Sequence, residues 1–374
     1  AIIAILIRCA EHHPQRGQQG VCANLPWCIP IGILRTAPDP SGAMRRLSFA
    51  LSSCTPSRTA TPAKPFRGGL DFNFIKEKIM DFQEYTIENE FLRVTVTTWG
   101  AQVKSVVRKC DGVEHMWQAD SNVWGYHAPI LFPHAGKVVD DIIHAKGQDY
   151  PSGQHGFARL MEHDWVRQTA TTLELELHSN PETLAHFPYE FRLTSTFALE
   201  GDKLHHTLTV KNRDGEVMPF GIGFHPAFAI PFDDRHTYAD YELRFNKMES
   251  PLCLGTQPLG LLHGSCYYLG DNIDRIPIDE ALFAGDSHCM TNLSSDTLGI
   301  YEKDTGRAVV CSIKDFPYTL LWSKPGVPQF VCIEPWNSLP SMEGSGTDWM
   351  KKPAAAILAP GEEWSTTLTT RFIR

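Results

Sequence analysis

The sequence around Glu334 combines a carboxylate with residues that remove it from water. Glu334 lies near the end of the apolar run 331–336, whose sequence is VCIEPW. An ionised carboxylate taken out of water costs several kcal/mol unless it is paired or used in chemistry. Pro335 is expected to stop strand pairing directly after it. Trp336 offers a flat apolar face of the kind on which a sugar ring can rest.

The alternative without a function for Glu334 is a solvent-facing position in a strand whose side chains alternate between core and solvent. In that reading Val331 and Ile333 point to the core, and Cys332 and Glu334 point outward. The choice between the two readings depends on whether acid and donor groups from elsewhere in the chain converge on Glu334.

Three earlier stretches carry such groups. Residues 128–137 (APILFPHAGK) end in a turn with His134 and Lys137, residues 155–159 (HGFAR) contain His155 and Arg159 and are followed by Trp165, and residues 220–228 (FGIGFHPAF) contain His225. A single buried histidine is more often structural than catalytic, and an arginine is as often a surface cation as a ligand clamp. The chain has sixteen histidines, so only the joint pattern of two histidines in Gly-rich aromatic turns and one Glu before Pro-Trp favours a functional site.

Composition restricts the class of protein. The chain has 374 residues, 42% of them apolar and 21% charged, which is typical of a soluble globular protein with a sizeable core. The net charge of −9 argues against a nucleic-acid binder. The apolar opening, residues 1–7, is too short to span a bilayer and lacks the basic region of a signal peptide. Ten cysteines without CxxC spacing or a regular framework favour a reduced, cytoplasmic protein with no metal site.

Residues 1–79 differ from the rest. They contain ten Lys and Arg but four Asp and Glu, whereas the remainder contains 24 and 39. Clusters of Pro, Gly, Ser and Thr interrupt every helical or strand periodicity of apolar residues in this segment. We therefore expect a poorly ordered extension followed by one domain, residues 80–374. A strand pattern begins at Met80, and residues 76–78 (KEK) are what a purine-rich ribosome-binding site reads as when translated. We therefore hypothesise that translation starts at Met80.

From Tyr85 onward the sequence predicts an all-β protein. Apolar and polar residues alternate at 92–97, 173–177, 191–197, 204–210, 309–313 and 364–372. Turn residues lie between these segments at 200–202, 214–215 and 360–361. Long amphipathic helical patterns are missing, which favours a large antiparallel sandwich over a parallel α/β sheet.

The motifs LFP…GK, HGFAR…W, GFHPAF and CIEPW, taken in that order, resemble the aldose 1-epimerase (galactose mutarotase) family, in particular its short bacterial mutarotase-like branch. The resemblance runs from about Met80 to the C-terminus. It implies a β-supersandwich of twisted antiparallel sheets whose concave face cradles a pyranose. It also implies that Glu334 is the general base, His225 the general acid and His155 a donor to the sugar.

The resemblance assigns further sugar contacts less directly. The family usually has Arg where this chain has Lys137, which keeps the charge but loses the bidentate fork. Asp286 is the candidate for the family's sugar-binding carboxylate. The remaining expected contacts are hydrogen bonds from Arg159 and aromatic faces from Trp336 and Trp165.

The implied reaction interconverts the α and β anomers of a glucose- or galactose-type monosaccharide, with one base, one acid and no cofactor. Partial burial would raise the pKa of Glu334 while leaving it ionised, and the carboxylate would keep His225 protonated. A hexose-6-phosphate 1-epimerase would need a cluster of cations, of which only Lys137 and Arg159 are evident. A non-catalytic sugar-binding protein would not need the acid–base pair, and a glycosidase would need a second carboxylate. The preferred sugar and the oligomeric state stay open.

Overall fold

A computed structural model describes residues 82–374. The extension 1–79 and the hypothetical start at Met80 lie outside the described residues. Within that range the regular structure is almost entirely β-strand. The helical segments are short: α3 (Pro181–Leu184), η2 (Val139–Asp141), η3 (Ala158–Leu160), η4 (Tyr238–Asp240) and η5 (Trp349–Lys351).

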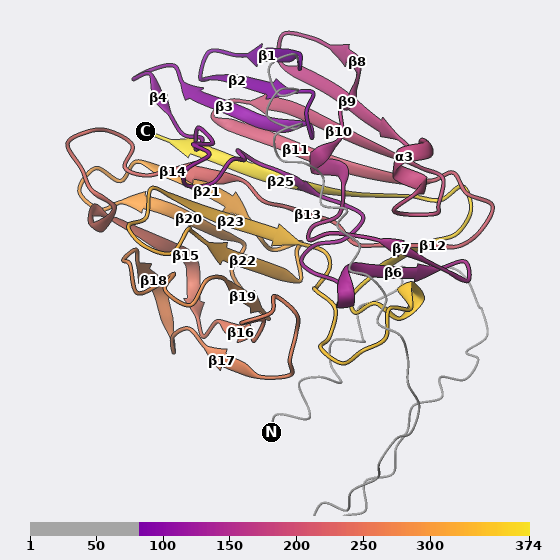
Figure 1. Ribbon diagram of the computed structural model, residues 1–374. Coiled ribbons are helices and arrows are strands. Elements are labelled where there is room, and N and C mark those ends of the chain that lie inside the picture. The colour runs from indigo at the N-terminus through magenta and orange to yellow at the C-terminus, as the bar shows by residue number, and fades with distance from the viewer. Residues whose placement is uncertain (1–81) are drawn as a thin grey trace, which may run out of the picture. The chain divides into compact units, whose positions relative to one another are not determined.

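Two large sheets form the frame of the domain (Figure 1). The nine-stranded sheet has the order β18 (Ile273–Pro277), β15 (Tyr241–Glu249), β20 (Thr297–Glu302), β21 (Ala308–Ser312), β25 (Glu363–Ile373), β11 (Lys203–Asn212), β10 (Phe191–Glu200), β9 (Thr172–His178) and β8 (Asp164–Gln168). The eight-stranded sheet has the order β17 (Cys266–Tyr268), β16 (Leu252–Leu254), β19 (His288–Thr291), β22 (Tyr318–Trp322), β23 (Phe330–Trp336), β13 (Gly223–Phe224) and β5 (Ile130–Leu131), with β14 (Ala227–Ala229) also paired to β23.

Three small sheets complete the strands. One contains β1 (Glu84–Glu88), β2 (Leu92–Thr97), β3 (Gln102–Arg108) and β4 (Val113–Glu114), and the other two pair β12 (Met218–Phe220) with β24 (Ala356–Leu358) and β6 (Ile142–Ala145) with β7 (Gln148–Pro151). The ladders between named strands are antiparallel, as the hairpin-rich sequence predicts.

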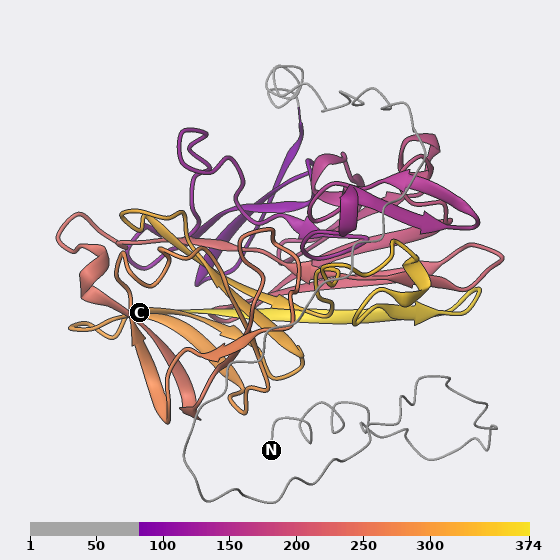
Figure 2. The ribbon, with the colours of Figure 1, turned by 60° about the horizontal axis from the view of Figure 1, so that its bottom comes forward.

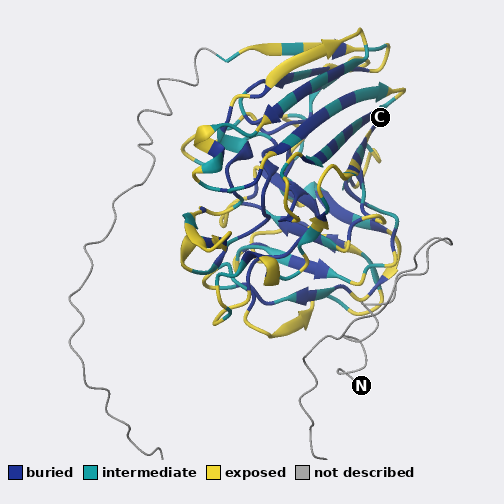
Figure 3. Cartoon of the chain, turned by 90° about the vertical axis from the view of Figure 1, so that its right-hand side faces the viewer, coloured by how far each residue is buried: buried dark blue, intermediate teal, exposed yellow. Residues whose placement is uncertain are grey.

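The predicted period-2 segments form strands of the two-layer core. In β11 the burial alternates at every residue, and in β9 the three leucines are buried while their neighbours are not. β10 and β11 form a hairpin whose register begins at Glu200 and Lys203, with Gly201 in the left-handed region (φ 57°) that this tight turn requires. Figure 3 shows the alternation of buried and less buried residues along these strands.

One continuous apolar core joins the two large sheets. It includes Leu175 and Leu208 from the nine-stranded sheet and Leu321, Val331 and Ile333 from the eight-stranded sheet. Figure 2 shows the long C-terminal strand β25, in yellow, between magenta strands from the first part of the described chain and orange strands that follow them in sequence. The expected all-β antiparallel sandwich is therefore confirmed.

No helix in residues 82–374 has the length and apolar character needed to cross a membrane. The six cysteines in this range are free thiols, four of them buried and two, Cys110 and Cys266, exposed. The cytoplasmic location stays a prediction.

Candidate active site

An interruption in one ladder brings His225 and Glu334 together. β14 pairs with the first part of β23, and β13 pairs with its last residue, Trp336, in the same antiparallel register. That register sets His225, in the link between β13 and β14, directly opposite Glu334. Pro226 and Pro335 flank the pair and carry no N–H to extend the ladder between them.

Pro335 does not end the strand, contrary to expectation. The pairing of β23 with β22 continues through Pro335 to Trp336, because β22 offers an uninterrupted edge on that side. A proline removes one donor without forcing the chain out of the extended conformation.

The two faces of β23 have different surroundings. Val331 and Ile333 enter the main core, as expected. Cys332 and Glu334 point to the opposite face, but that face is covered by loops, and Glu334 is 1% exposed. The alternation therefore predicts the faces correctly, while the solvent-facing alternative for Glu334 is wrong.

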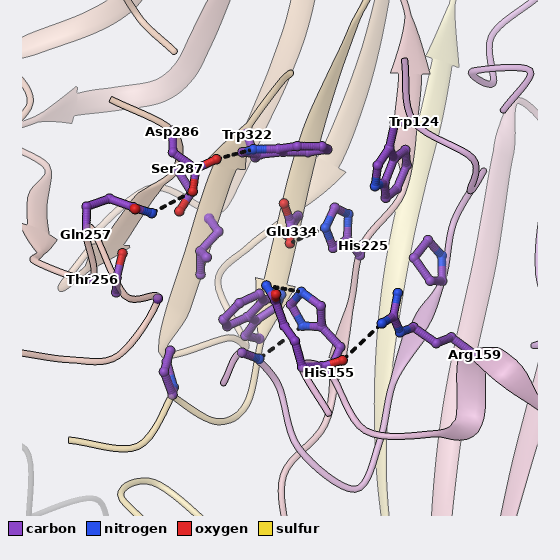
Figure 4. Close-up of a pocket in the computed structure, with 17 residues that line it drawn as sticks. Trp124, His155, Arg159, His225, Thr256, Gln257, Asp286, Ser287, Trp322 and Glu334 are labelled. Carbon is purple, nitrogen blue, oxygen red and sulfur yellow. Dashed lines mark hydrogen bonds and ion pairs between the residues drawn. The ribbon is translucent and has the colours of Figure 1, made fainter. Parts of the chain in front are cut away.

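A cavity of about 350 Å³ lies over this covered face of the eight-stranded sheet (Figure 4). Its volume falls in the range of small-ligand sites. The wall is formed by residues from β22, β23, η3 and the surrounding loops: Trp124, Pro129, Gly136, Gln154, His155, Arg159, His225, Thr256, Gln257, Gly260, Asp286, Ser287, Leu320, Trp322, Glu334, Trp336 and Pro340.

Glu334 and His225 form a buried pair at the centre of the cavity. The distance from His225 Nε2 to Glu334 Oε2 is 3.4 Å, and His225 is 7% exposed. Burial raises the pKa of Glu334 well above its ordinary value, and the charge of Asp286 raises it further, while the nearby Trp336 indole lowers it. Burial lowers the pKa of His225 to about 3. Because burial opposes a charge on either group, we expect the pair to hold one proton between them and to be neutral as a unit.

This electrostatic state refines the expectation from the sequence. Partial burial of Glu334 was expected to leave it ionised beside a protonated His225. Burial is nearly complete instead, so ionised Glu334 is available only when the shared proton sits on His225.

Two tryptophans fix the imidazole ring of His225. Trp124 stacks on it with ring centroids 5.0 Å apart, and Trp322 meets it edge-on at 5.7 Å. Trp124 and Trp322 also contact each other at 5.3 Å. The ring is therefore held with Nε2 toward Glu334.

The second predicted histidine occupies a strained turn on the cavity wall. His155 has φ 67° and Gly156 has φ 66°, and a Cβ on Gly156 would lie 2.3 Å from the carbonyl oxygen of Phe132. The Gly136 N–H donates to His155 Nδ1 at 3.0 Å, so the neutral ring carries its proton on Nε2. Burial lowers the pKa of His155 well below its ordinary value. His155 is thus a neutral N–H donor. The side-chain amide of Gln154 lies 3.2 Å from the same Nε2, and only its oxygen, in the flipped orientation of the amide, can accept from that N–H.

Arg159 lies on the opposite side of the cavity from Asp286 (Figure 4). It belongs to η3, and its Nη2 donates to the backbone carbonyl of Gln154 at 3.1 Å. The guanidinium lies 4.9 Å from the ring centre of Tyr126. Its Nε is buried without a hydrogen-bond partner. Burial lowers the pKa of Arg159, but a guanidinium stays charged throughout the physiological range.

Asp286 is held by two neutral donors. Trp322 Nε1 donates to Asp286 Oδ1 at 2.7 Å, and Gln257 Nε2 donates to Oδ2 at 2.5 Å. Its backbone is left-handed, with φ 75°. The candidate carboxylate thus lies on the cavity wall, oriented from both sides.

Two predicted sugar contacts are not on the cavity wall. Lys137 is absent from the wall, although its Cδ lies 3.4 Å from where a Cβ on the wall residue Gly260 would lie. Trp165 lies on β8, at the edge of the nine-stranded sheet, where it is 49% exposed and packs near Tyr85. Trp165 follows HGFAR closely in sequence, but the chain leaves the site after η3. Trp336 does line the cavity, edge-on to His155 at 5.7 Å.

Sequence reasoning misses several wall residues with aromatic or polar side chains: Trp124, Gln154, Thr256, Gln257 and Trp322. Trp322 ends the apolar segment 318–322, where alternation places it on the same face as Leu320. That periodicity was the available indication for Trp322. The others lie in loops with no periodic pattern.

Two groups of potential metal ligands occur in residues 82–374. In the first, Cys332 joins His225 and Glu334, but burial raises the pKa of its thiol, so it packs as a neutral apolar neighbour. In the second, outside the cavity, Arg307 pairs with both Asp233 and Glu302. The carboxylates of the second group are therefore already neutralised by protein.

Comparison with known proteins identifies the family and the fold. Residues 83–371 match the family model described as aldose 1-epimerase. The chromosomal LacX protein of Lactococcus lactis subsp. lactis is 31% identical over 283 residues, covering 73% of this chain and 94% of LacX. The structure of a galactose mutarotase-like protein from Lactobacillus casei ATCC 334 is 31% identical with a TM-score of 0.73, covering 77% of this chain and 99% of that one.

The structure of a galactose mutarotase related enzyme from Lactobacillus acidophilus is 27% identical with a TM-score of 0.75, covering 78% of this chain and 98% of that one. The described residues thus have the galactose mutarotase-like fold. From the extent of the family match and the identity to LacX, the chain belongs to the aldose 1-epimerase family.

Proposed function

We propose that the protein is an aldose 1-epimerase that interconverts the α and β anomers of a free hexose. The observation that carries the proposal is the buried His225–Glu334 pair, 3.4 Å apart, at the centre of a cavity of small-ligand size. Anomer exchange needs one base and one acid near the same hemiacetal, and this pair supplies both.

The shared proton defines the reacting state. With the proton on His225, the Glu334 carboxylate takes the proton of the anomeric hydroxyl as the imidazolium protonates the ring oxygen. The C1–O5 bond breaks, and the aldehyde forms. Rotation about the C1–C2 bond presents the other face of the carbonyl to the C5 hydroxyl. Reclosure returns a proton to His225 and one from Glu334 to the new anomeric hydroxyl, so the pair ends as it began.

The remaining wall residues would position the sugar. His155 would donate from Nε2, Asp286 would accept from sugar hydroxyls, and Arg159 would donate from its guanidinium. The faces of Trp124 and Trp322 would pack against the sugar ring or hold the imidazole of His225, the general acid, in place. A well-oriented acid or base contributes about 10²–10⁴ in rate.

The direct test is mutarotation of freshly dissolved α-D-glucose and α-D-galactose in a polarimeter. Glu334→Gln and His225→Asn should fold and lose exchange above the buffer rate. Glu182→Gln and His178→Asn, exposed residues outside the cavity, are matched controls that should keep it. Full activity in either site variant would refute the assignment.

The same assay separates the two alternatives. Faster exchange of glucose 6-phosphate than of glucose would identify a hexose-6-phosphate 1-epimerase. Sugar binding in a calorimeter, with exchange at the buffer rate, would identify a non-catalytic sugar-binding protein.

A further inference from the structure

Arg159 is a cation built into the wall of the cavity without an anionic partner. Within residues 82–374 its guanidinium forms no ion pair: its contacts are the Gln154 carbonyl and the Tyr126 ring. Its buried Nε has no hydrogen-bond partner. A charge partly removed from water is costly unless a counter-charge is present. Because Arg159 lines the cavity, an anionic group of a ligand bound there would supply that counter-charge.

The reaction chemistry fixes which part of the sugar faces Arg159. Glu334 must reach the anomeric hydroxyl, and His225 must reach the ring oxygen. The charge of Arg159 acts on His225, whereas the charge of Asp286 acts on Glu334, and the close-up shows the two on opposite sides of the pair (Figure 4). In a pyranose the ring oxygen is followed by C5 and its exocyclic carbon. The exocyclic group on C5 thus falls on the Arg159 side.

The charges on the wall favour a singly charged anion. Arg159 is the single Arg or Lys among the wall residues of the described chain, and its forked donors match a carboxylate. With the His225–Glu334 pair neutral, the charges of Arg159 and Asp286 already balance, so a carboxylate adds one net negative charge to the site and a phosphate dianion adds two. A singly charged anion is therefore favoured over a phosphate dianion.

Building on the proposed function, we propose that the preferred substrates are aldoses with a carboxylate on C5, the hexuronic acids, bound through Arg159. The uronate carboxylate then accepts from the guanidinium, and Asp286 contacts hydroxyls on the other side of the ring. Neutral hexoses bind in the same pose with a hydroxyl in place of the carboxylate and gain less from Arg159.

The test compares anomer exchange of D-galacturonate, D-galactose and galactose 6-phosphate at pH 7, each corrected for its buffer rate. We expect kcat/KM for the uronate to exceed that for galactose by about tenfold or more. Arg159→Gln should lower the uronate value by about 10- to 100-fold and the galactose value by about 2- to 5-fold. Arg159→Lys should fall between, since it keeps the charge without the fork. Lys137→Gln, which removes a nearby cation off the wall, should leave the ratio unchanged.

Calorimetric binding of the three sugars separates this proposal from the proposed function. Tighter binding of galacturonate that depends on Arg159 supports the selectivity even if no sugar is turned over, a result that would refute only the epimerase activity. Equal effects of Arg159→Gln on galacturonate and galactose would overturn the proposal while leaving the epimerase activity intact. A preference for galactose 6-phosphate, or a ratio that Lys137→Gln also changes, would overturn it as well.

Discussion

The neutral, proton-sharing state of His225 and Glu334 leads to a specific pH dependence. With independent groups at ordinary pKa values of 4.5 and 6.5, the reacting state, ionised Glu334 with protonated His225, would be abundant only between those values. Above pH 6.5 its population would fall about tenfold per pH unit, or about 30-fold by pH 8.

The structure predicts a broader profile. Burial lowers the pKa of His225 and raises that of Glu334, so the singly protonated pair persists on both sides of the ordinary range. Removing the shared proton leaves an uncompensated buried carboxylate, which moves the alkaline limb above pH 6.5. We expect kcat/KM at pH 8 to stay within about twofold of its value at pH 6.5.

The Glu334→Gln variant gives a second test of the proton held between His225 and Glu334. Without the carboxylate, His225 loses its proton-sharing partner and stays neutral near pH 7, so the variant lacks both base and acid. The loss should be about 10²–10⁴-fold, and adding His225→Asn should change it by no more than a few-fold.

The assay is the initial rate of optical rotation change at low sugar concentration from pH 5 to 9. The Glu334→Gln protein supplies the blank at each pH. An alkaline limb with a midpoint near 6.5 would show a freely titrating imidazole and refute the shared proton. Additive losses in the double variant would refute it independently.

Three further predictions concern residues that support the site or the core. Trp322→Phe removes the N–H that orients Asp286, and we expect kcat/KM to fall about 10- to 100-fold, mainly through KM, with little change in the pH profile. Gly156→Ala places a Cβ against the Phe132 carbonyl at positive φ, and denaturant unfolding should show a loss of about 2–4 kcal/mol. Burial lowers the pKa of His206 to about 3, below its unfolded value of 6.5, so its stabilising contribution is complete above pH 6.5 and is lost as the pH falls. His206→Leu should therefore reduce the slope of unfolding free energy against pH between 4 and 6 by up to about 1.4 kcal/mol per unit, and an unchanged slope would contradict the assignment.

Sequence periodicity captures the frame of this protein because half-buried antiparallel strands alternate. The predicted segments at 173–177 and 204–210 are β9 and β11, with their apolar residues in the core. In β23 the alternation separates Ile333 from Glu334 correctly, but it carries no information on what covers the outer face. Loops from elsewhere in the chain cover it, and no local pattern encodes that.

The site is predictable where a residue sits in a distinctive motif. His225, Glu334 and His155 converge on one cavity as the resemblance implied, and Asp286 joins them. Trp165 was expected there because it is near HGFAR in sequence, although it belongs to the other large sheet. Proximity in sequence does not predict proximity in space where the chain passes from one sheet to the other.

The short link between β13 and β14 carries His225 and Pro226. The number of residues in this link decides to which side of the sheet the His225 side chain points. Side chains on an extended segment change sides with every residue added or removed. Inserting one residue between β13 and His225 would point the imidazole into the apolar interior, whereas inserting two residues would keep its direction and alter only its distance. Natural length variation at this point should therefore occur in even steps.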